Sequence, residues 1–348
     1  MLRPLALTVL GAACIALPRR ADAQVSIDGV IYANYRHGLE RDSAFTPPAR
    51  PSNFELERAY LNVRSKSEGG ISTRVTVDVD GRRATGGQQT IRLKYAFVDW
   101  TPEGSPVTWR FGMQNTPIIG YLADIWGYRM QGTVPIDRAR YLTSSDIGLG
   151  AEGSWMANGL TAHAGVFNGE GYSNAPGDNR KDAALRVSMR LLPTNDTGPT
   201  GGLRVTGFAS VGRATGGAVR DRFLALLTYK TKTLTLGAEY WLTADSTAAD
   251  AETSGRITSL FATHRLEGSR VGLLARVDRW DPNTDLSPSA FDAAASRQTR
   301  VVAGVSYQLA PNARLLLDAD IVSAQGSAIP NAFQAANRSV YVHTEIKF

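Results

Sequence analysis

The chain has 348 residues, a formal net charge of +6 and a single cysteine, Cys14. Because Cys14 lies in the first segment, the rest of the chain offers no disulfide, no catalytic thiol and no cysteine-bound metal. The basic excess alone would suit a nucleic acid, an acidic lipid or an anionic solute as partner.

Residues 1–23 are predicted to be a cleaved secretory signal peptide. Arg3 supplies a positive start, residues 5–17 form an apolar run, and Ala21-Asp22-Ala23 is a cleavage site. The apolar run is too short to span a membrane. We therefore expect export by the Sec route, with residues 24–348 as one mature domain, and export argues against a nucleic-acid partner.

From residue 25 onward the dominant pattern is an alternation of apolar and polar side chains. Ile71, Val75 and Val79 share one face of a predicted strand, and Arg74 and Asp78 share the other. Such a strand contacts two different solvents. About sixteen segments of roughly ten residues follow this pattern, which is the length of a tilted membrane strand. Their expected starts lie near Val25, Phe54, Ile71, Thr90, Pro106, Asp146, Leu160, Ala183, Gly202, Arg222, Thr233, Arg256, Val271, Gln298, Ala313 and Ser339.

The connections between these segments alternate between short and long. The short ones include Asn158-Gly159, the dipeptide typical of a two-residue hairpin. Outer-membrane barrels have short periplasmic turns and long external loops. Closing the sheet into a barrel gives every backbone N–H and C=O group a hydrogen-bond partner inside the membrane, where water is absent. We therefore predict an all-β, transmembrane, antiparallel up-and-down β-barrel in a Gram-negative type of outer membrane. The long connections span residues 37–53, 114–145, 168–182, 244–255, 281–297 and 323–338.

The last predicted strand is amphipathic and ends in an aromatic residue, Phe348. Phe348 shares one face of this strand with Val340, Val342 and Ile346, and His343 lies on the opposite face. This arrangement is typical of the signal by which outer-membrane proteins engage the barrel-assembly machinery. An ordinary surface strand that ends in Phe is the alternative.

Three sequence stretches resemble the phosphate-selective porin O/P-like family. They are residues 54–61 (FELERAYL), 94–100 (KYAFVDW) and 109–117 (WRFGMQNTP). The resemblance implies a sixteen-stranded homotrimeric porin in which long loops fold inward and a basic constriction selects anions such as phosphate. The chain departs from the family at Asn115, where a Lys often precedes the Thr-Pro pair. This departure leaves the identity of the anion open.

A barrel of about sixteen strands is too wide for side chains to fill, so it leaves an aqueous lumen. We therefore predict passive diffusion of small hydrophilic solutes. Basic residues outnumber acidic ones on the predicted inward face, which favours anions. The candidate anion-binding residues are Arg74, Arg92, Lys94 and Arg110 on strands, and Arg129, Arg138 and Arg140 in the third long loop, which folds inward in similar porins. In the alternative interpretation, the loop arginines form structural ion pairs with Asp124, Asp137 and Asp146.

Two other functions were weighed. In the first, the long loop plugs the lumen and the barrel is structural or adhesive. In the second, the barrel is an enzyme that uses His163 or His264 as a base. No nucleophile motif supports catalysis, so we expect no enzymatic activity, cofactor or metal. The remaining partner expected is outer-membrane lipid.

Overall fold

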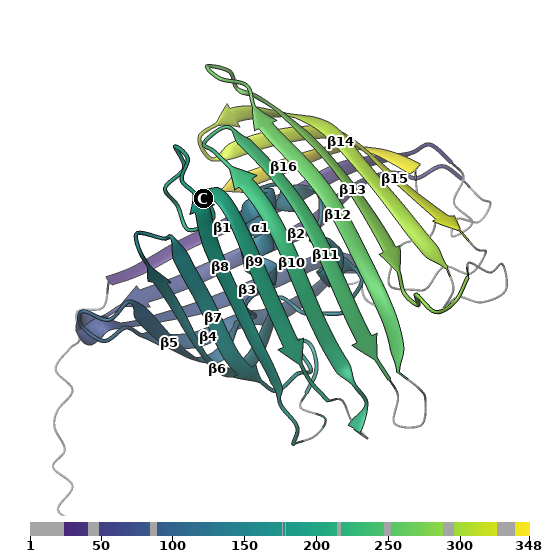
Figure 1. Ribbon diagram of the computed structural model, residues 1–348. Coiled ribbons are helices and arrows are strands. Elements are labelled where there is room, and N and C mark those ends of the chain that lie inside the picture. Colours follow the sequence, from purple (N-terminus) through teal and green to yellow (C-terminus); the bar gives the residue numbers. More distant parts are fainter. Residues whose placement is uncertain are drawn as a thin grey trace, which may run out of the picture.

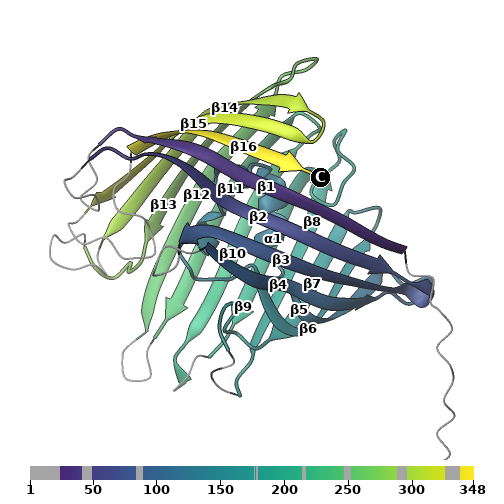
Figure 2. The same cartoon turned by 180° about the vertical axis from the view of Figure 1, so that it is seen from behind.

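The computed structural model is a closed barrel of sixteen antiparallel strands, which confirms the predicted fold class (Figures 1 and 2). Each strand pairs with its neighbours in sequence, and β1 closes the barrel against β16. The structure describes residues 24–40, 49–83, 89–175, 177, 179–213, 217–246, 252–287, 296–325 and 338–348. The predicted signal peptide lies outside these residues.

Every predicted strand start lies within three residues of an observed one. This agreement arises because the two-residue period is set by the contrast between the barrel's two surfaces. The strands are β1 (Gln24–Gly38), β2 (Ser52–Lys66), β3 (Ile71–Arg83), β4 (Gln89–Trp100), β5 (Val107–Asn115), β6 (Ser145–Trp155), β7 (Leu160–Phe167), β8 (Asp182–Leu192), β9 (Gly202–Val211), β10 (Arg220–Lys230), β11 (Leu234–Asp245), β12 (Thr253–Arg265), β13 (Val271–Asp281), β14 (Arg297–Ala310), β15 (Ala313–Gln325) and β16 (Arg338–Lys347).

The side chains of the wall are arranged inside out relative to a soluble protein. On β3, Asp78 is 0% exposed and Thr76 is buried, whereas the alternating Val75 is 43% exposed. The same division holds on β9, where Arg204 is buried and Val205 is exposed. Apolar side chains thus cover the outside, as a lipid-facing surface requires, and charged groups face the lumen.

A β-bulge at Lys94 alters the inward face of β4. Thr76 pairs with Tyr95 and Val77 pairs with Leu93, so Lys94 is left without a partner on β3. The extra residue shifts the alternation by one. Lys94 and Phe97 are therefore both buried, although an odd number of positions, three, lies from one to the other, while Val98 is exposed.

The connection between β5 and β6 contains short helices. They are α1 (Ile119–Trp126), the 3₁₀ turn η2 (Arg129–Gln131) and α2 (Pro135–Arg138); a second 3₁₀ turn, η1 (Glu68–Gly70), joins β2 to β3. None of the helices in the described ranges is long and apolar enough to cross a membrane.

Barrel closure gives a first prediction, at Phe348. Its N–H donates to the Gly29 carbonyl at 3.1 Å, and its own carbonyl accepts from the Gly29 N–H at 2.9 Å. Its ring lies over Gly29, where an added Cβ would approach the ring to 2.3 Å. We expect deletion of Phe348, or Gly29→Val, to lower the folded fraction several-fold, measured by heat-modifiable mobility on gels. Phe54→Ala removes an exposed aromatic at the other rim and should leave that fraction unchanged; an equal loss would contradict a specific role for Phe348.

Candidate pore constriction

The connection between β5 and β6 is packed against one side of the barrel wall. Ile118, Leu122, Ile125 and Trp126 are buried in one cluster with inward side chains of strands β9 to β15. The members of this cluster on β9 to β15 are Phe208, Leu224, Leu226, Trp241, Ile257, Phe261, Leu274, Trp280, Val302 and Leu316, and Tyr32 on β1 also belongs to it. The apolar residues of the loop therefore have matching apolar partners on the wall. Burial of this kind fixes the position of the loop.

Four wall arginines fasten the loop by stacking on its aromatic rings. Three of them also donate to loop carbonyls: Arg186 to Pro117 at 2.8 Å, Arg222 to Tyr141 at 3.2 Å and Arg314 to Gly127 at 2.7 Å. A guanidinium group can stack on an aromatic ring and at the same time donate hydrogen bonds to a carbonyl, so it can hold the loop through both contacts. The pairs are Arg186 over Tyr121 (4.1 Å), Arg222 over Tyr141 (4.8 Å), Arg276 over Trp126 (5.1 Å) and Arg314 over Tyr128 (4.4 Å). We call these four arginines the loop clamps.

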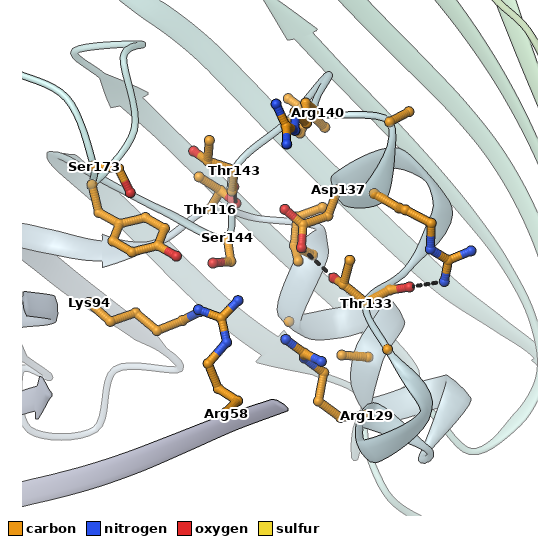
Figure 3. A pocket seen from close by; sticks show the side chains of 18 of the residues that line it. Arg58, Lys94, Thr116, Arg129, Thr133, Asp137, Arg140, Thr143, Ser144 and Ser173 are labelled. Atoms are coloured by element: carbon orange, nitrogen blue, oxygen red, sulfur yellow. Dashed lines mark hydrogen bonds between the residues drawn. The ribbon is translucent and has the colours of Figure 1, made fainter. Parts of the chain in front are cut away.

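A cavity of about 1620 Å³ is lined by the loop and by strands β1 to β4, β6 to β11 and β14 to β16. Its lining includes eleven Arg or Lys residues and eight Asp or Glu residues, a basic excess of three. The excess is smaller than the sequence suggested, because several wall arginines serve as clamps. Figure 3 shows the side chains of Arg58, Lys94 and Arg129 around this space, with the hydroxyl groups of Thr116, Thr143, Ser144 and Ser173 nearby.

Lys94 is the most isolated charge of the cavity wall. Its side chain is enclosed by the rings of Tyr60, Tyr95 and Tyr172, whose centroids lie 5.0, 5.8 and 5.2 Å from Nζ. Nζ also lies 3.4 Å from the Tyr60 hydroxyl oxygen. Among the described residues, no carboxylate lies within 4 Å of it. Its charge is therefore not neutralised locally, and the residue is only 8% exposed.

Three other predicted residues also lack a close carboxylate partner within the described part of the chain. Arg74 donates to Thr76 and Asn62 and stacks on Tyr95. Arg129 reaches Glu57 only at 4.0 Å, and its Nη1 is buried without a hydrogen bond. Arg140 is exposed to the cavity, at a left-handed φ of 61°, and forms no ion pair with a described residue. These groups have donors available to a passing anion.

The remaining predicted site residues are paired. Arg92 bonds Asp80, Arg110 bonds Asp99 at 2.6 Å, and Arg138 bonds Asp278 at 3.3 Å and the Thr133 carbonyl at 2.5 Å. Of these, Arg92 and Arg138 line the cavity and Arg110 does not. The alternative interpretation holds for Arg138 in that it forms an ion pair, but its partner is Asp278 rather than Asp124, Asp137 or Asp146. Within the described ranges, Asp137 accepts from Thr133, and Asp146 accepts from the backbone of Ile147 and Gly169.

Sequence reasoning missed the tyrosines around Lys94. Tyr60 lies on β2, Tyr95 follows the bulge on β4, and Tyr172 belongs to the connection after β7. The bulge had no local signal, because alternation alone places Tyr95 on the outer face. Only the closed topology brings residue 172 to residue 94.

Solved porin structures share this architecture. The anion-selective porin of Comamonas acidovorans matches with a TM-score of 0.69 and 14% identity, over 94% of this chain and 100% of that one. Salmonella typhi OmpF matches with a TM-score of 0.64 and 13% identity, over 93% of this chain and 97% of that one. OmpT of Vibrio cholerae matches with a TM-score of 0.60 and 13% identity, over 94% of this chain and 98% of that one. Identities this low show a common fold alone. No family model and no curated protein matches the chain, so the resemblance to the O/P-like family stays a prediction.

Proposed function

We propose that the protein is an outer-membrane porin through which small anions diffuse passively. The observation that carries this proposal is a water-accessible cavity beside the loop in which Lys94, Arg129 and Arg140 lack close carboxylate partners. A lumen lined by an excess of cations raises the local concentration of anions and lowers that of cations. A homotrimer, assembled by the barrel machinery after removal of residues 1–23, completes the proposal.

Phosphate is the proposed solute within this class. Guanidinium and ammonium groups with adjacent hydroxyls provide the donors that a phosphate oxygen accepts. Asn115, which stands where the O/P-like family often has Lys, accepts a bond from Arg110 and does not line the cavity. Phosphate would therefore meet Lys94 and Arg129 instead.

The test is the reversal potential of reconstituted channels in a planar bilayer under a KCl gradient, followed by added phosphate. We expect a reversal potential on the anion side and a phosphate-dependent block of chloride current. Conductance without anion preference would contradict the selectivity. The buried loop core favours a plugged structural barrel as second candidate, and absence of conductance would support it.

The histidines considered for catalysis do not lie together. His163 is buried on β7, whereas His264 is exposed on β12 and lies opposite Leu234 of β11. Within the described ranges, no three His, Cys, Asp or Glu side chains are grouped to hold a metal ion. We propose that substituting either histidine leaves conductance unchanged, which a bilayer recording of His163→Gln and His264→Gln would check.

Selectivity should depend weakly on pH through Asp124 of α1, which lies beside the cavity but is not among the residues that line it. Burial raises the pKa of this carboxyl, and attraction to Lys230 only partly opposes the shift. Asp124 therefore loses its negative charge at a higher pH than ordinary carboxylates, which titrate near 4. We expect anion preference to rise by about twofold or less as the pH falls through the raised pKa of this carboxyl. Asp124→Asn should remove this step and show the higher preference at pH 7; superimposed titrations of the two proteins would refute the assignment.

A further inference from the structure

The outer surface of β12, β13 and β14 carries three arginines near the rim with long connections. They are Arg256, Arg279 and Arg297. By the two-residue period of the strands, each lies on the same outer face as an exposed apolar residue of its own strand, respectively Leu260, Val277 and Val301. We call them the outer arginine cluster. Arginine on the lipid side is costly at mid-membrane and becomes tolerable only near the headgroups. Three neighbouring examples therefore call for a physical reason.

The strand register orders this surface into rows. Leu260, Val277 and Val301 pair across the three strands and form an apolar row. One step toward the rim, Arg279 pairs with Thr258 on one side and Thr299 on the other. The polar row continues to Tyr240 of β11 and Ser323 of β15. Charged groups therefore begin one row beyond the apolar surface, at the height of a lipid headgroup.

The outer arginine cluster holds more positive charge than its surroundings neutralise. Asp281 accepts from Arg297 at 2.7 Å and lies 3.7 Å from Arg256, so one carboxylate serves two guanidinium groups. Arg279 is exposed and forms no ion pair with a described residue. With Asp281 included, the cluster carries a formal charge of +2, and no carboxylate of the described residues is paired with the Arg279 guanidinium.

We infer that the outer arginine cluster binds the phosphate groups of a phosphorylated lipid in the leaflet at the long-connection rim. The inference rests on the proposed membrane location. Arginine matches phosphate geometry with two parallel donors, and hydroxyls of Thr258 and Thr299 flank Arg279. The adjoining row of Leu260, Val277 and Val301 offers an apolar surface to an acyl chain, which a free phosphate does not need.

The test compares lipids that differ only in phosphate. Detergent-purified protein is titrated with a bis-phosphorylated glucosamine lipid, its dephosphorylated form and inorganic phosphate, and bound lipid is counted by native mass spectrometry. We expect retention of the phosphorylated form and at least about tenfold weaker binding by Arg279→Gln combined with Arg256→Gln. The matched control is Arg213→Gln, an arginine near the same rim that is paired with Asp221 at 3.0 Å.

The outcomes separate this inference from the proposed function, because each protein is also recorded in a bilayer. Anion conductance together with equal retention of both lipids overturns the lipid site and leaves the porin standing. If inorganic phosphate at the same concentration as the lipid prevented lipid retention, the lipid site would also be overturned, because the cluster would then bind a soluble anion as well as it binds the lipid. Lipid retention without conductance would support the cluster and refute the porin. Heat-modifiable mobility shows that the variants are folded.

Discussion

Replacing Lys94 and Arg129 together by glutamate should convert an anion-preferring channel into a cation-preferring one. The cavity lining has eleven basic and eight acidic residues, so its excess is three positive charges. The double reversal changes the lining by four charges and leaves one negative in excess. Because no described carboxylate lies close enough to either residue to compensate, the change acts directly on permeating ions. The reversal potential under a KCl gradient is expected to change sign.

A matched control distinguishes the effect of charge in the cavity from the effect of the overall charge of the protein. Lys232→Glu with Arg265→Glu changes the protein by the same four charges. Lys232 lies in the turn between β10 and β11, Arg265 ends β12 and donates to the Lys232 carbonyl, and neither residue lines the cavity. We expect its reversal potential to stay on the anion side. Lys94→Arg with Arg129→Lys keeps both charges and should keep the preference. If the turn variant shifted selectivity as far as the cavity variant, the site would be misassigned.

The wall of this barrel could be predicted from the sequence because its physics is local. Each strand separates lipid from water, so alternation alone places Asp78 inside and Val75 outside. Strand order needed no further information, because an up-and-down barrel pairs neighbours in the chain. The inward orientation of Arg74, Arg92 and Lys94 followed from the same rule.

The division of labour among the inward arginines could not be predicted in this way. Alternation gives Arg276 and Lys94 the same status, although one is a loop clamp and the other has no carboxylate partner among the described residues. The difference comes from how residues 116–144 pack against the wall, which depends on contacts with strands far away in sequence. A basic inward face is therefore a weaker guide to anion binding than the subset of cations that lacks partners.

Arg276→Met is expected to be the most destabilising single substitution of a loop clamp. Arg276 is 2% exposed and bonds Glu239 and Asp278, each at 2.7 Å, whose side chains are 1% exposed. Removing the guanidinium leaves two buried carboxylates without their main counter-charge. Loss of one partner from a buried ion pair costs about 3–5 kcal/mol. Urea unfolding in lipid vesicles, followed by tryptophan fluorescence, would measure the loss and the release of Trp126 from its contact with Arg276.

The matched control is Arg64→Met, because Arg64 forms an ion pair of similar length with different exposure. Its Nε lies 2.8 Å from Asp28, but the two side chains are 44% and 45% exposed. Water and ions screen such a pair, so its loss should cost about 1 kcal/mol or less. The triple variant Arg276→Met, Glu239→Gln, Asp278→Asn removes the stranded charges and should recover much of the stability. Equal losses for Arg276→Met and Arg64→Met, or no recovery in the triple variant, would show that the buried charges do not determine the stability of the clamp.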